Sequence, residues 1–121
     1  LCADQGVGVI PWSPLARGFL AGNRRPDKTG ETVRSQTDDF AHQMYYAPSD
    51  FQVAERAAEL GGRRGVTPAQ VALGWLLGRP GVVAPIIGAS KISQIEDAVA
   101  GLAALAFSSE ELEAFEGILR P

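Results

Sequence analysis

The sequence is poor in the residues that build disulfides and metal sites, with one cysteine and one histidine among 121 residues. The lone cysteine, Cys2, cannot form a disulfide within the chain, and no metal-ligand spacing is present. Basic residues are outnumbered by acidic ones, 11 to 14, for a net charge of −3. This balance gives no basic footprint for nucleic acid or for an anionic membrane surface.

Long hydrophobic runs are also missing. No apolar stretch reaches the roughly 18 residues of a membrane span, and no charged leader with an apolar core precedes the first motif. The chain opens on Leu1 rather than methionine, so we expect a cut chain in which residues 1–3 end a helix and Cys2 is buried there. A hydrophobic content of 45% with 21% charged residues is ordinary for a soluble globular protein. A cytoplasmic enzyme fits these features.

Two short apolar runs predict buried β-strands. The first covers residues 7–10, where Pro11 and Pro14 forbid a helix directly after the run, and with its turn it forms a strand region over 7–17. The second covers residues 82–87. Residues 18–50 show no sustained period and are rich in turn formers, which predicts a long loop of the kind that covers a ligand.

Helical periodicity appears in the ranges 51–78 and 92–119. The first helix is expected over 51–60, stopped by Gly61 and Gly62. A second is expected over 66–77, where Thr67, Pro68 and Gln70 supply an N-cap, a proline at the first helical position and a capping-box partner.

After the second strand, apolar residues at spacings of three and four predict a helix over 92–102. Ser108 and Glu111 form another capping box before a final helix that ends near residue 119. A strand, a helical crossover and a second strand predict a parallel pair with a right-handed connection.

The residues that could carry chemistry follow the two strands. Trp12 offers a flat aromatic face at the end of the first strand. At the end of the second, Gly88, Ser90 and Lys91 precede a helix, where unpaired N–H groups, the helix dipole and a cation favour a negative charge. Two strand ends are therefore expected to face one ligand.

The order and spacing of the first segment, the 66–77 helix and the second segment resemble the C-terminal part of the aldo-keto reductases, over nearly the whole chain. The resemblance implies an α/β fold, the C-terminal portion of a (β/α)8 TIM barrel holding its last two parallel strands plus helices. Two strands cannot close a barrel. An incomplete barrel exposes apolar surface, so we expect the chain alone to oligomerise, to remain partly molten or to need the missing part.

The resemblance also implies an NADP cofactor and assigns its contacts. Trp12 would stack on the nicotinamide, the turn that follows would wrap the pyrophosphate, and Ser90 with Lys91 would hold the 2′-phosphate, flanked by the adenine contacts Gln94 and Asp97. The expected cofactor-binding residues are Trp12, Ser13, Pro14, Leu15, Ala16, Gly18, Arg34, Gly88, Ser90, Lys91, Gln94 and Asp97.

Each assignment has a plainer alternative. Trp12 could be a core tryptophan, residues 13–18 a proline-rich turn, and Lys91 a solvated lysine in a βα turn. The chain departs from its relatives at Ala98, where an asparagine is frequent, and at Asn23, where a lysine is. Arg34 would then replace part of that charge, although the loop cations Arg24, Arg25 and Lys28 equally fit solvated charges.

No residue is assigned to catalysis. In the family a tyrosine donates the proton beside a lysine, an aspartate and a histidine, and those four belong to earlier strands. His42, Tyr45 and Tyr46 include the usual proton carriers, but they lie in a polar loop with no lysine or carboxylate at a telling distance. We expect them to line the contact of that loop with the barrel or to shape the substrate mouth.

The resemblance therefore implies an NADP(H)-dependent oxidoreductase that reduces aldehydes or ketones, of which this chain supplies the cofactor cradle and lacks the catalytic tetrad. Its partner would be a small-molecule carbonyl substrate. Two alternatives stay open. One is a non-catalytic NADP-binding regulatory subunit, such as the relatives that pair with ion channels. The other is an inactive truncated fragment or a small α/β module with an incidental likeness.

Overall fold

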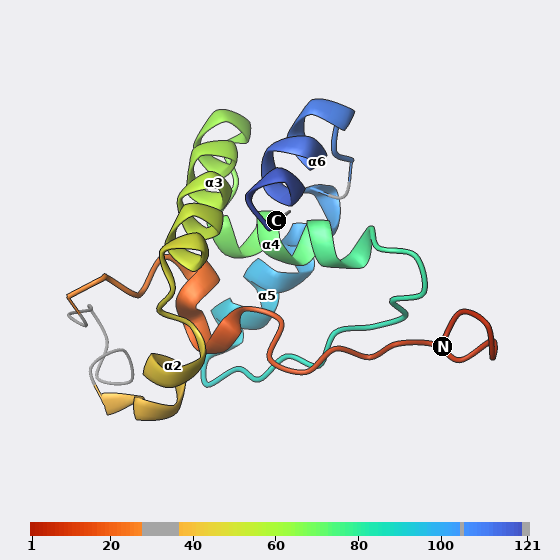
Figure 1. Ribbon diagram of the computed structural model, residues 1–121, viewed down its shortest axis with the longest axis horizontal. Coiled ribbons are helices and arrows are strands. Elements are labelled where there is room, and N and C mark those ends of the chain that lie inside the picture. Colours follow the sequence, from red (N-terminus) through yellow and green to blue (C-terminus); the bar gives the residue numbers. More distant parts are fainter. Residues whose placement is uncertain (28–36, 105, 120–121) are drawn as a thin grey trace.

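The computed structural model describes residues 1–27, 37–104 and 106–119 (Figure 1). Figure 1 shows α3 and α6 side by side over α4, with α5 beneath it. The helices are α2 (Asp39–Met44), α3 (Pro48–Arg64), α4 (Pro68–Leu77), α5 (Ile92–Ala100) and α6 (Ser109–Glu116), and the 3-10 turns are η1 (Ala16–Ala21), η2 (Gly101–Ala104) and η3 (Gly117–Leu119).

Two helix starts are confirmed in atomic detail. The Thr67 hydroxyl accepts from the Gln70 N–H at 3.2 Å, and the Gln70 side chain accepts from the Thr67 N–H at 3.0 Å, with Pro68 at the first helical position of α4. Ser108 and Glu111 form the same reciprocal pair at the start of α6. Both boxes satisfy N–H groups that a helix start leaves unpaired.

Helix α3 is longer than the predicted 51–60. It begins at Pro48, where the Asp50 carboxylate accepts from the Ala47 N–H at 3.0 Å, and it ends at Gly65 in the left-handed region. Gly61 therefore lies inside the helix. A Cβ on Gly61 would stand 2.7 Å from the Val66 carbonyl oxygen, so the glycine allows α3 to pack closely against the start of α4.

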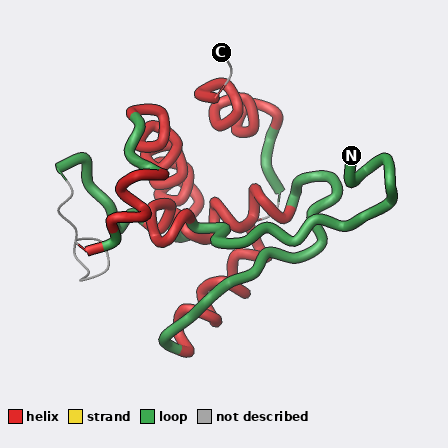
Figure 2. Tube along the Cα trace, turned by 60° about the horizontal axis from the view of Figure 1, so that its bottom comes forward, coloured by secondary structure: helices red, strands yellow, loops and turns green. Residues whose placement is uncertain are grey.

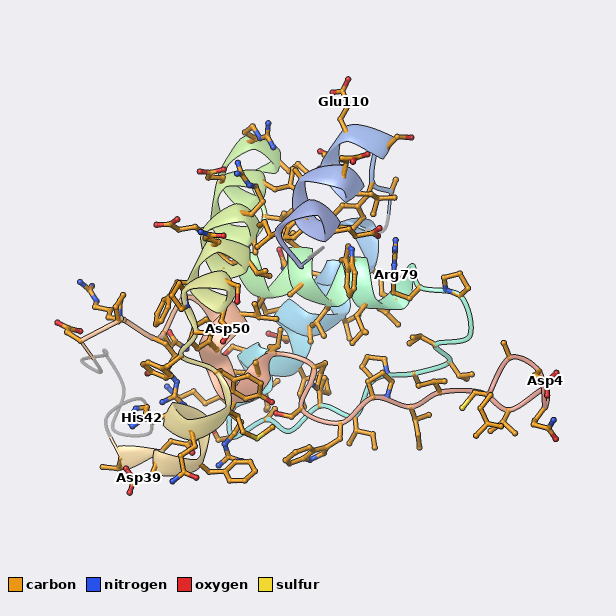
Figure 3. All side chains as sticks on the ribbon, in the orientation of Figure 1. Asp4, Asp39, His42, Asp50, Arg79 and Glu110 are labelled. Atoms are coloured by element: carbon orange, nitrogen blue, oxygen red, sulfur yellow. The ribbon has the colours of Figure 1, made fainter. Side chains whose placement is uncertain are left out.

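The core lies where α3, α4 and α6 meet. It consists of Ala57, Leu60, Val71 and Phe115, with Val53, Val66 and Phe107 packed against it. Across its edge, Arg64 on α3 donates a pair of hydrogen bonds to the Glu111 carboxylate. Figure 3 shows Arg79 at the end of α4, from where it donates to Glu116 on α6 at 2.6 Å. These contacts fix the helices around one apolar centre.

The two predicted strand segments run side by side as loops, and the described residues contain no multi-residue strand (Figure 2). They meet in two parallel bridges, Val9 with Val82 and Trp12 with Ile86. The predicted parallel direction is confirmed, whereas the predicted continuous strands are not formed. Pro11 and Pro85 lack the N–H groups that a ladder needs, and each segment has a single partner.

Apolar side chains of this pair stand in solvent. Val7, Ile10 and Val83 are more than half exposed, and so are Ile92 and Val99 on α5, a helix that contains no buried residue. Cys2 is exposed in the N-terminal turn, so the expected burial is wrong. Figure 3 shows Asp4 of the same turn far from the helices, so none of the helices of the described chain covers the cysteine.

Residues 18–50 are predicted as a loop, but their described part contains the end of η1, the whole of α2 and the first three residues of α3. Phe19 of η1 is buried against Tyr46 and Phe51, with ring centroids 5.6 and 4.9 Å away. This aromatic cluster holds η1 against the start of α3. In the described ranges, no helix is long and apolar enough to span a bilayer.

Candidate functional site

An open cleft of about 670 Å³ lies where the two predicted strand segments end. Figure 1 shows the segment before α5 running beside the N-terminal segment towards η1. The cleft is lined by Trp12, Ser13, Pro14, Leu15, Arg17, Gly18, Ala21, Asn23, Arg24, Ala69, Leu73, Ile86, Ile87, Gly88, Ala89, Ser90, Gln94, Asp97 and Ala98. The site thus combines both segments with η1, α4 and α5.

Trp12 is one of the residues that line this cleft. The bridge to Ile86 fixes the backbone position of Trp12, and the Ile86 N–H donates to the Pro11 carbonyl at 2.9 Å. The tryptophan is 63% exposed, which excludes the core alternative in this chain. A large, exposed aromatic surface beside a cleft is available for stacking on a flat ligand.

The turn after Trp12 holds unusual backbone. Three of its residues other than glycine have positive φ angles, 53° at Ser13, 48° at Ala16 and 56° at Arg17, and Gly18 follows at 90°. Residues other than glycine rarely adopt a positive φ unless surrounding contacts stabilise it. Here the Ser13 hydroxyl accepts from the Arg17 N–H at 3.3 Å, and its carbonyl accepts from the Ala16 N–H at 2.9 Å. A strained turn at the mouth of a cleft suits a binding site.

Asp38 ties this turn to α2. Its carboxylate accepts from the Arg17 Nε at 2.8 Å, from an Arg24 Nη at 3.2 Å and from the Ala41 N–H at 3.1 Å, so that it also caps α2. The side chains of Asp38 and Arg24 are only 5% and 1% exposed. Hydrogen bonding from Arg17 lowers the pKa of Asp38 to about 2, against the opposing effect of burial.

The second segment meets the cleft through Ser90 and the start of α5. The Gln94 side-chain oxygen accepts from the N–H groups of Ser90 and Lys91, at 2.8 and 3.2 Å, and lies 3.3 Å from the Ser90 hydroxyl. A Cβ on Gly88 would meet nothing within 4 Å. The space beside Gly88 is therefore open to a ligand, whereas the expected unpaired N–H groups of Ser90 and Lys91 are occupied by Gln94.

Asp97 lines the cleft and also joins α5 to α4. Its carboxylate accepts from the Gln70 side-chain amide at 2.9 Å and lies 3.3 Å from the Thr67 hydroxyl. The Asp97 side chain therefore has structural partners within the capping box of α4. A ligand bound by Asp97 would therefore compete with Gln70 and Thr67 for the carboxylate oxygens.

The structure brings most of the predicted contacts together. The predicted residues that line the cleft are Trp12, Ser13, Pro14, Leu15, Gly18, Gly88, Ser90, Gln94 and Asp97. Ala16 and Lys91 lie next to lining residues without lining the cleft themselves, and Arg34 lies outside the described residues.

Sequence reasoning missed the two arginines of the cleft. Arg24 was weighed as a solvated charge, and that interpretation is wrong, because the side chain is buried beside Asp38. Arg17 was passed over although it stands inside the motif. In the sequence, Arg17 and Arg24 are followed across a loop by Asp38. This pattern is too common to indicate a buried network of charges.

His42, Tyr45 and Tyr46 do not reach the cleft. The His42 and Tyr46 rings meet edge to face with their centroids 4.8 Å apart, and the ring centroids of Tyr45 and Phe19 are 6.4 Å apart. Figure 3 shows His42 on α2, at the opposite end of the molecule from Asp4. These residues build the aromatic cluster around η1 instead of an acid-base group.

The sequence model of the aldo/keto reductase family matches residues 1–120. Among curated proteins, the chain is 37% identical to versiconal hemiacetal acetate reductase of Aspergillus parasiticus, over 95% of this chain and 33% of that protein. It is 41% identical to an aldo-keto reductase of Metarhizium robertsii (82% and 26%) and 33% identical to L-glyceraldehyde 3-phosphate reductase of Escherichia coli O157:H7 (90% and 32%). The chain spans about a third or less of the length of these relatives.

Proposed function

This chain belongs to the aldo/keto reductase family, and from that premise we propose that it supplies the cofactor cradle of an NADP(H)-dependent oxidoreductase. The family implies an oxidoreductase built on a (β/α)8 barrel. We place this chain as the C-terminal part of that barrel, with residues 7–17 and 82–87 as its last two strands. The substrates would be aldehydes or ketones.

The observation that carries the proposal is the shared cleft. Trp12 and Ser90 come from segments more than seventy residues apart, and both line one cavity of about 670 Å³. The parallel bridges set the ends of the two segments at the same edge, the edge at which α/β proteins bind their ligands. A single elongated molecule can therefore contact both segments.

The lining residues fit a dinucleotide from one end to the other. The exposed Trp12 indole offers a face to the nicotinamide ring, and the turn of Ser13, Leu15 and Ala16 offers backbone groups to the pyrophosphate. Gly88 leaves open space at the second segment, where Ser90 and Lys91 would hold the 2′-phosphate. That phosphate would take over the N–H groups that the Gln94 oxygen now accepts from.

When bound, NADPH supplies the hydride for carbonyl reduction. The part played by this chain would be to bind and orient the cofactor, with Trp12 holding the nicotinamide ring and the second segment holding the adenosine. None of its residues is proposed to move the proton. The tyrosine, lysine, aspartate and histidine of the family would stand outside this chain.

The remaining assignments follow from the same placement. The exposed apolar side chains of the strand pair and of α5 would meet the rest of the barrel, or a second copy where that part is missing. A cytoplasmic location and a small-molecule carbonyl substrate are proposed with the activity.

The proposal is tested by comparing the binding of NADPH and NADH to the full-length protein by calorimetry. Wild type should bind NADPH more tightly. Lys91→Ala should weaken NADPH more than NADH, because only NADPH carries the extra phosphate that a lysine can pair with. Arg63→Ala, which removes an exposed cation from α3, should change neither. Failure of the wild-type protein to bind either nucleotide would refute the proposal.

A further inference from the structure

Two contacts fix the orientation of the Arg17 guanidinium. Its Nε donates to Asp38 at 2.8 Å, and its Cζ lies 5.4 Å from the centre of the Phe40 ring. Arg17 is one of the residues that line the cleft, and its side chain is 23% exposed. Within the described part of the chain, Nη1 and Nη2 of Arg17 have no hydrogen-bond partner. Two donors of one cation are thus left for a ligand.

We propose that Arg17 is the residue whose side chain binds the diphosphate of the dinucleotide, an inference that rests on the proposed function. A planar guanidinium with one edge held by a carboxylate presents its remaining donors as a fork, which matches two phosphate oxygens. Arg17 lines the same cleft as the neutral Asn23 and supplies a positive charge there.

Asp38 and Arg24 act as positioning residues for this cation. Asp38 holds the Nε, and Arg24, whose side chain is 1% exposed, donates to the Arg17 carbonyl at 3.0 Å. That bond holds the backbone of Arg17, which has a φ of 56°. The left-handed conformation of Arg17 allows its side chain to reach Asp38 while the residues of the turn still line the cleft.

Two other cations in or near the cleft fit the diphosphate less well. Arg24 is buried and donates to Asp38 and to the Arg17 carbonyl. Lys91 stands at the start of α5 and does not line the cleft. In the described part of the chain, Arg17 is the lining cation that has both solvent access and available donors.

The test uses Arg17→Gln in the full-length protein, with Arg63→Gln as the matched control on the exposed surface of α3. Dissociation constants are measured by calorimetry for NADPH, NADH and adenosine 2′-monophosphate, which lacks the diphosphate. Circular dichroism melting checks that each variant is folded. Loss of a charge-assisted pair should weaken NADPH and NADH by about tenfold or more, and by similar factors, since both carry the diphosphate.

The third nucleotide separates a direct contact from a general disturbance of the cleft. Adenosine 2′-monophosphate should bind Arg17→Gln within about twofold of wild type, because it never reaches Arg17. The inference is overturned if Arg17→Gln leaves NADPH within twofold, or if it weakens all three nucleotides by one factor. A wild-type protein that binds neither NADPH nor NADH would refute the proposed function itself, an outcome distinct from both.

Discussion

Trp12 and Ile86 are joined in a parallel β-bridge, and both residues line the same cleft. The bridge is short, yet it sets the register of two segments that are far apart in the sequence. Gly8 contributes to this closeness, because a Cβ there would stand 2.3 Å from a methyl carbon of Val83. The ends of the two segments therefore lie side by side and form one surface of the cleft.

Removing the Asp38 carboxylate should destabilise the protein strongly. Asp38→Ala removes the buried carboxylate to which Arg24 donates, and it removes the cap of α2. Together these losses should cost about 3 kcal/mol or more in the free energy of unfolding. Urea denaturation of the full-length protein measures it. Asp39→Ala, which removes the exposed neighbouring carboxylate, serves as control, and equal losses for the two variants would contradict the account.

Stability should fall in acid because of the same group. The pKa of Asp38 is lowered to about 2 in the folded protein, whereas an unfolded aspartate titrates near 4. The stabilisation is therefore complete above pH of about 4 and is lost as the pH falls from about 4 towards 2. The N–H of Ser108, followed by Arg64, lowers the pKa of Glu111 as well, with the same sign.

The acid effect is measured as the free energy of unfolding between pH 6 and pH 2. Asp38→Asn should flatten the pH dependence in the acid window, and Asp4→Asn, in the exposed N-terminal turn, should leave it unchanged. An unaltered slope in Asp38→Asn would show that Asp38 does not carry the effect.

Two neighbouring glycines should respond with opposite signs. Gly61→Ala places a Cβ 2.7 Å from the Val66 carbonyl oxygen, so it should destabilise by about 1–3 kcal/mol, the usual cost of overpacking. Gly62→Ala meets nothing within 4 Å and should stabilise helix α3 by about 0.5–1 kcal/mol. Thermal melting of both variants checks this, and a shared sign would contradict the packing of α3 on α4.

The 121-residue chain on its own should not behave as a compact monomer. Ile92 and Val99 of α5 are 76% and 57% exposed, and Ile10 of the strand pair is 60% exposed. Such apolar surface drives association or leaves a partly molten state. Light scattering should detect oligomers or a dye for apolar surface should bind, and Ile92→Glu with Val99→Glu should reduce both signals. A monomer with one sharp unfolding transition would count against the missing-barrel interpretation.

The sequence was most informative where the cause of structure is local. The start of α4 depends on Thr67, Pro68 and Gln70, three residues within one turn, and their bonds appear as predicted. The parallel direction of the two segments followed from the length of the crossover between them. Neither inference needed a long-range contact.

Features that depend on distant partners could not be predicted. Gly61 and Gly62 looked like a helix stop, but α3 continues because its packing on α4 outweighs the weak helix propensity of glycine. The burial of Arg24 depends on Asp38, fourteen residues away. Cys2 is exposed because no described residue covers the N-terminal turn, a fact about neighbours that the local sequence does not contain.

The cofactor cradle is tested most directly by titrating the full-length protein with NADPH and following tryptophan emission. Wild type should be quenched on binding, Trp75→Phe should be quenched by nearly the same amount, and Trp12→Phe should lose most of the response, because Trp12 lines the cleft and Trp75 does not. Equal quenching in Trp12→Phe and wild type would contradict the assignment of this cleft to the dinucleotide.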